Sequence, residues 1–117
     1  MKISKKFDLI VIENNIIPLK GYSYINILGI IFCHKGYTNK LSITTANHEK
    51  IHTEQQKEML FIFFYIWYVV EWLIKLIKYH NSHKAYTLIC FEKEAKLNQT
   101  DLEYITIRNH YSWLNYL

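Results

Sequence analysis

The longest apolar run is the sequence feature that most limits what this chain can fold into. Met59–Val70 holds twelve residues without a charge, whereas a helix that spans a bilayer needs about 20 apolar residues. Glu71, Lys75 and Lys78 then follow at spacings of three to four residues, which predicts a polar stripe on a helix. We expect residues 59–79 to form a buried core helix. A helix lying on a membrane surface is the alternative, and a true span is the least favoured.

Length and composition narrow the classes of protein further. The chain has 117 residues, which predicts a single domain over 1–117 and excludes a separate cofactor domain. Half of the residues are hydrophobic, and only three Gly and one Pro occur, which excludes a disordered or linker-rich chain. The net charge is +4, but Arg108 is the only arginine and the lysines are scattered. We therefore expect no nucleic-acid partner, while a weak attraction to anionic lipid fits the charge.

The cysteines and the N-terminal segment bear on the compartment. Cys33 and Cys90 form no C-x-x-C pair, so we expect two buried thiols in a reducing compartment. The segment MKISKKFDLIVIENN begins with lysines, but Asp8 and Glu13 interrupt its apolar stretch and no small-residue cleavage site follows. It predicts a strand and not a signal peptide. The expected location is the cytoplasm, and association with the inner face of the membrane is compatible with it.

The pattern of elements predicts an α+β fold, β-rich over 1–45 and helical over 46–117. The expected strands are 7–13, 22–33 with a bend at Gly29, and a short strand at 40–45. The segment from 45 to about 80 lacks Gly and Pro and predicts one helix, or two with a kink near Phe63. A further helix is expected over 84–98, and a last one runs from a T-x-x-E capping box, Thr100 to Glu103, as far as Tyr116. The result is a small β element followed by three to four helices.

One motif carries chemistry: His48-Glu49-Lys50-Ile51-His52, an H-E-x-x-H sequence on a predicted helix. Histidines at i and i+4 lie one turn apart on one helical face, so both imidazoles can point at one metal ion. Glu49 lies on the shoulder of that face, where it can reach a metal-bound water. Zinc hydrolases use this arrangement of two His ligands and a Glu general base.

Catalytic zinc takes three protein ligands, so a third must come from elsewhere. The metzincin continuation needs a Gly and a third His shortly after His52, and the residues directly after it, TEQQ at 53–56, exclude that class. The remaining common solution is a Glu on a following helix, and the sequence FEKEA offers Glu92 and Glu94.

H-E-x-x-H followed by F-E-x-x-A resembles the gluzincin type of zinc metallopeptidase, which includes CAAX-prenyl endopeptidases and antibiotic-sensor metallopeptidase domains. The resemblance implies a minimal zincin-like fold, with Glu92 as the third zinc ligand and Ala95 as the small residue that packs against the active-site helix. The family has an Asp at the next position, where this chain has Lys96. That Asp supports the site without binding the metal, so this chain is expected to lack one of the family's supporting contacts. Glu94 is then an outward, solvated carboxylate or one that supports the site.

A second resemblance covers most of the chain but brings no activity with it. The chain is similar to a group of small bacterial proteins, chiefly from Bacteroidetes, in which four features recur in order. Here these features are NHEKIH at 47–52, Gln55, the aromatic stretch FYIWY at 64–68 and FEKEA at 91–95.

If the site binds zinc, His48, His52 and Glu92 hold the ion and Glu49 accepts a proton from its water. Gln55 lies on the same face as His48 and is expected to hydrogen-bond near the site. An oxyanion donor is also needed. The candidates of the right type are Tyr86, Tyr104 and His110.

Three function classes follow from these observations. The first is a zinc-dependent metallopeptidase that cleaves a peptide or protein substrate. The second is a zinc-binding protein without catalysis, and the third is a metal-free helical module at a membrane surface. The intact Glu49 favours the first class, because a purely structural site has no use for a base. The short chain leaves little material for a substrate cleft, so a homodimer is a further expectation.

Overall fold

The computed structural model describes residues 1–18 and 22–117 and has the expected α+β architecture. The strands are β1 (Lys2–Lys6), β2 (Leu9–Glu13), β3 (Tyr24–Ile27) and β4 (Ile30–Cys33). The α-helices are α1 (Ile43–Glu58), α2 (Ile62–Tyr79), α3 (Ser82–Thr87), α4 (Cys90–Asn98) and α5 (Tyr104–Ile107). Two short 3-10 helices complete the described elements, η1 (Thr38–Lys40) and η2 (Ser112–Tyr116).

The four strands form one sheet in the order β1-β2-β4-β3. Two antiparallel hairpins, β1–β2 and β3–β4, are joined through a parallel pairing of β2 with β4 that sets Val11 opposite Ile31. The predicted single strand over 22–33 was therefore wrong. Leu28 and Gly29 both have positive φ, 56° and 85°, and form the tight turn between β3 and β4.

The first hairpin turns at Phe7 and Asp8, whose φ values are also positive, 51° and 64°. Two-residue turns with both φ positive match the twist of a hairpin, but their usual sequence signals are Asn-Gly and Asp-Gly. Phe-Asp gives no such signal, so the sequence did not predict β1 as a strand separate from β2. The expected strand at 40–45 was wrong as well, because Ser42 caps α1 by accepting a hydrogen bond from the Thr45 amide.

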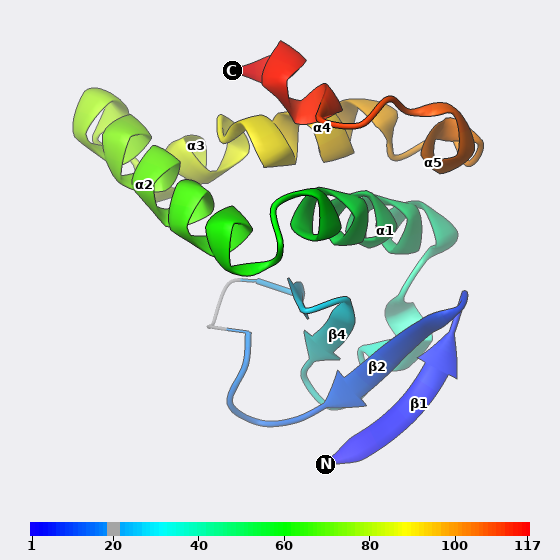
Figure 1. Ribbon diagram of the computed structural model, residues 1–117. Helices are drawn as coiled ribbons and strands as arrows, with labels where there is room; N and C mark the ends of the chain where they lie inside the picture. Colours follow the sequence, from blue (N-terminus) through cyan, green and yellow to red (C-terminus); the bar gives the residue numbers. More distant parts are fainter. Residues whose placement is uncertain (19–21) are drawn as a thin grey trace.

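Figure 1 shows α1 lying between the sheet and a second group of helices. On its lower side, α1 covers a core that contains Val11, Ile31 and Cys33 of the sheet together with Ala46. On its upper side, α1 contacts α4, which packs against η2 near the C-terminus. A second core joins Phe64 of α2 to α4 and η2. Both cysteines are buried, as expected.

α2 leaves α1 at a bend of 111° after Leu60 and Phe61, both with positive φ. Phe64 and Glu71 are its only buried residues, so the prediction of a core helix was wrong. Glu71, Lys75 and Lys78 share one face of α2 as predicted, but Glu71 is buried there: its carboxylate accepts hydrogen bonds from the Cys90 amide and from Trp67 Nε1. No helix in the described ranges is by itself long and apolar enough to cross a bilayer; only the bent pair α1–α2 meets that test jointly.

The C-terminal third departs from the predicted helices in two places. The expected helix over 84–98 is interrupted at Leu88 and Ile89 and forms α3 and α4. The expected capping box at Thr100 is replaced by Asp101, whose Oδ1 accepts from the Glu103 amide. The last helix has only four residues because Arg108 adopts an extended backbone and its side chain turns inward.

Candidate metal centre

α1 carries the first half of the site on the face that meets α4. His48, His52 and Gln55 recur at i, i+4 and i+7, which places them on one side of the helix. Glu92 lies in the first turn of α4 and points at the same place from across the interface. The sequence therefore identified the residues, and the packing of α1 on α4 brings them together.

The three side chains meet at single atoms. The Nε2 atoms of His48 and His52 are 3.1 Å apart and lie 3.1 Å and 2.9 Å from Glu92 Oε1. In the described part of the chain, this is the one cluster of His, Cys and carboxylate groups arranged to hold a metal ion. Three ligand atoms around a tetrahedral zinc ion at about 2.0 Å would be about 3.3 Å apart. The observed geometry fits such an ion after outward shifts of a few tenths of an ångström.

Two glutamines hydrogen-bond the Nδ1 atoms of the histidines, which are the ring nitrogens that do not contact Glu92. His52 Nδ1 donates to Gln55 Oε1 at 2.7 Å, and His48 Nδ1 donates to Gln99 Oε1 at 2.8 Å. With one proton held on Nδ1, loss of the Nε2 proton leaves each ring with a lone pair on Nε2 that points at the place an ion would take beside Glu92. Such partners fix the tautomer and orientation of metal-ligating histidines.

The orientation of the Gln55 amide is set by its own partners. Gln55 Nε2 donates to Phe91 O at 3.1 Å and to Glu94 Oε1 at 2.9 Å, and both of these atoms can only accept. Gln55 Oε1 must therefore face His52. Glu94 in turn accepts from Arg108 at 2.9 Å and 3.1 Å and from the Tyr104 hydroxyl.

These contacts correct the prediction of a solvated Glu94. The side chain is fully buried and supports the site through Gln55. Tyr104 and His110, two of the candidate oxyanion donors, also lie elsewhere. Tyr104 binds Glu94, and the ring of His110 is 89% exposed beside Glu58.

The pKa values of Glu92 and His52 depend strongly on each other's charge. Burial alone would raise the pKa of Glu92, but the charge on His52 and hydrogen bonds from both histidines outweigh burial and lower that pKa well below its usual range. Burial alone would lower the pKa of His52, but the Glu92 carboxylate raises it to about 9. Without a metal, the cluster is thus a buried ion pair that holds a proton in the place of a cation.

Glu49 lies one residue after His48 and faces a cavity of about 570 Å³ that also borders His52 and Glu92. Its carboxylate makes no hydrogen bond to any other residue of 1–18 or 22–117, although the residue is only 7% exposed. Burial raises the pKa of Glu49, and the neighbouring histidines oppose this only in part. A carboxylate with a raised pKa beside an open cavity is suited to accept and return a proton.

The remaining wall of the cavity is aromatic, and most of its polar atoms already have partners. Tyr68 donates to Glu92 Oε2 at 2.7 Å, Tyr65 donates to Gln56 Oε1, and Trp72 Nε1 donates to Ser82 O. Tyr86 lines the cavity as predicted for a residue near the site. Its pKa is raised by burial and by the charges of Glu92 and Glu49, so it stays a neutral hydroxyl.

Three residues of the site were missed in the sequence. Asn47 and Tyr68 lie in stretches shared with the small bacterial proteins, but no role was predicted for them or for Gln99, because each acts through a partner more than 20 residues away. Asn47 donates to the carbonyls of Asn98, Gln99 and Asp101 and so fixes the end of α4 beside His48.

Comparison with protein-family models, with curated proteins and with solved structures returns no match for this chain. The gluzincin resemblance therefore stays a prediction that depends on residues 48–52 and 92–95.

Proposed function

We propose that this chain is a zinc-dependent peptidase. The observation that carries the proposal is the convergence of His48, His52 and Glu92 on one point, with the carboxylate of Glu49 beside it and a cavity in front. Two His and one carboxylate leave a fourth position for water, which is the donor set of catalytic zinc. A zinc-binding protein without catalysis would have no need of a buried base that hydrogen-bonds to no residue of 1–18 or 22–117.

Each residue of the site has a separate task. When bound, zinc supplies a water of lowered pKa and polarises the scissile carbonyl. Glu49 would accept a proton from the attacking water and return it to the amine as the carbon–nitrogen bond breaks. Tyr86, which lines the cavity, would donate a hydrogen bond to the carbonyl oxygen, and Tyr68 holds the second oxygen of Glu92 so that Oε1 faces the histidines.

The lining of the cavity suggests the class of peptide. Tyr65, Tyr68 and Trp72 present ring faces while their polar atoms bind other protein groups. A substrate side chain inside would lose its hydration without gaining hydrogen bonds. Bulky apolar side chains next to the cleaved bond are therefore favoured over charged ones.

The first experiment is elemental mass spectrometry of the purified chain beside four variants. We expect about one zinc per chain in the wild type, in Glu49→Gln and in the control His83→Ala, which changes an exposed histidine. His48→Ala and Glu92→Ala should lose the zinc. A different metal, or the same zinc content in all variants, would contradict the assignment of a zinc site.

The second experiment tests catalysis with quenched fluorescent peptides that carry Phe, Leu or Asp at the central position. Cleavage should occur with Phe and Leu, and Glu49→Gln should lower its rate by at least 100-fold while the zinc stays bound. Cleavage that survives in Glu49→Gln would contradict the role of this base. Bound zinc without any cleavage would favour the non-catalytic zinc protein.

A further inference from the structure

α2 exposes a continuous apolar face to solvent. Its outer stripe consists of residues that are each 45–74% exposed: Ile62, Phe63, Ile66, Val69, Val70, Leu73, Ile74 and Ile77. At 100° per residue these eight positions fall within an arc of about 140°, and no polar residue interrupts the arc. An ordinary surface helix has the opposite arrangement, with its apolar side inward.

The inner side of α2 explains why the stripe faces outward. Glu71, the helix's one carboxylate, is buried and binds the amide at the start of α4. Phe64 packs in the second core, and Tyr68 reaches Glu92. These contacts fix the rotation of the helix about its own axis, so the stripe cannot turn inward without breaking them.

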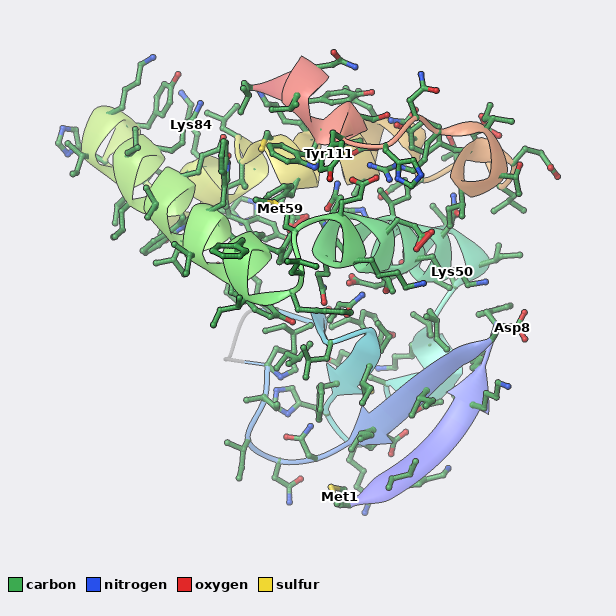
Figure 2. All side chains as sticks on the ribbon, in the orientation of Figure 1. Met1, Asp8, Lys50, Met59, Lys84 and Tyr111 are labelled. Atoms are coloured by element: carbon green, nitrogen blue, oxygen red, sulfur yellow. The ribbon has the colours of Figure 1, made fainter. Side chains whose placement is uncertain are left out.

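The charges around the stripe are all of one sign. Between residues 59 and 91 the exposed charged side chains are lysines, because Glu71 is the only acidic residue in that stretch and it is buried. Lys78 and Lys84 lie at the C-terminal end of α2, where Lys84 is also placed over the Tyr79 ring. Figure 2 shows Lys84 at this far end of the helix.

We propose that the outer stripe of α2 binds the surface of an anionic lipid bilayer. An apolar helical face with Lys78 beside its C-terminal end, and with no exposed carboxylate in residues 59–91, matches a helix that lies in the interface, with its apolar side among the acyl chains and its cation at anionic headgroups. A second copy of this chain fits less well. The stripe offers eight residues on one convex helix, whereas a stable protein interface takes about 20–30 residues a side.

The outer stripe of α2 reaches the wall of the cavity. Val69 belongs to the stripe and lines the cavity beside Glu49 and His52. A bilayer on the stripe would therefore lie next to the mouth of the site. The lipid proposal itself needs no metal, so it stands or falls separately from the peptidase proposal.

The test is cosedimentation of the full chain with vesicles of phosphatidylcholine alone and with phosphatidylglycerol added. We expect the wild type to bind the anionic vesicles, with or without a chelator. The variant Ile66→Glu/Ile77→Glu should bind them at least ten-fold more weakly. The control Leu97→Glu/Ile107→Glu changes two side chains of similar exposure on α4 and α5 and should bind as the wild type does.

Circular dichroism of each variant shows that the fold is kept, since all four positions are exposed. Wild-type protein that stays in the supernatant with anionic vesicles would overturn the proposal, as would equal binding by the Ile66→Glu/Ile77→Glu variant. Light scattering tests the alternative that a second copy of this chain covers the stripe. A wild-type dimer that becomes a monomer in this variant, without vesicle binding, would assign the stripe to a second copy and overturn the lipid surface.

Discussion

At the scale of single residues, the centre is a set of groups whose protons depend on one another. Gln55 fixes the tautomer of His52, and Glu92 accepts from both histidines. Helical spacing predicted His48, His52 and Gln55, and the resemblance to gluzincins predicted Glu92. The sequence could not predict that Glu94 is buried, since its partner Arg108 lies beyond an irregular segment.

The first prediction concerns the pH dependence of the metal-free protein. His52 has a pKa of about 9 in the fold against 6.5 in an unfolded chain, so its contribution to stability is complete below pH 6.5 and is lost as the pH rises through 9. Glu92 has a lowered pKa, so its contribution is present above pH 4.5 and is lost as the pH falls below that value. The free energy of unfolding should therefore be greatest between about pH 4.5 and 6.5.

Urea denaturation of chelator-treated protein across pH 4–10 measures this profile. We expect a decrease on the order of a few kcal/mol between pH 6.5 and 9. In His52→Gln that decrease should largely disappear. A variant whose stability falls as steeply as that of the wild type would show that other groups cause the change.

At the scale of elements, α2 and α4 depend on each other through Glu71. The N-terminus of α4 has no cap from its own sequence, since Ile89 precedes it, and Glu71 of α2 supplies the missing acceptor. A carboxylate at this end also meets the positive pole of the helix. The sequence placed Glu71 on a solvated stripe because helical periodicity shows which residues share a face but not which face turns inward.

We expect Glu71→Ala to lower the free energy of unfolding by about 1–2 kcal/mol, because the Cys90 amide loses its buried acceptor. Glu71→Gln keeps one acceptor oxygen and should cost less. Urea denaturation compares the two variants with the wild type. Equal stability of Glu71→Ala and the wild type would mean that water replaces the carboxylate at no cost.

Sequence patterns predicted some of the elements and missed others. The α+β class and the two helical segments around the motif followed from composition and from the absence of Gly and Pro. The two hairpins did not, because Phe7-Asp8 and Leu28-Gly29 adopt positive φ without the usual turn residues at both positions. The long final helix also failed, since a buried ion pair at Arg108 outweighs the local helical preference.

At the scale of the whole molecule, Arg108 joins three parts of the chain. It binds Glu58 at the end of α1 at 2.8 Å and Glu94 of α4 at 2.9 Å, and its side chain is 4% exposed. The segment after α5 is thereby fastened to both helices that carry the candidate ligands. Removing one partner of a buried ion pair leaves the other charges uncompensated.

Arg108→Met should therefore lower the free energy of unfolding by about 3 kcal/mol. Lys96→Met removes an exposed cation and serves as the control, with an expected change below about 0.5 kcal/mol. Thermal denaturation of metal-free protein measures both. A similar loss in the two variants would show that net charge, and not the buried contact, is responsible.

The joining of α1 and α4 by Arg108 has a consequence for synthesis. A ribosome makes α1 first, so a growing chain carries His48 and His52 before Glu92 exists, and Glu94 is made before the arginine that holds it. Two histidines on one helical turn lack the third donor of a catalytic zinc site. The three residues of the centre can therefore meet only after Glu92 has been made, and the ion pairs that fasten α1 and α4 to the C-terminal segment form only after Arg108 has been added.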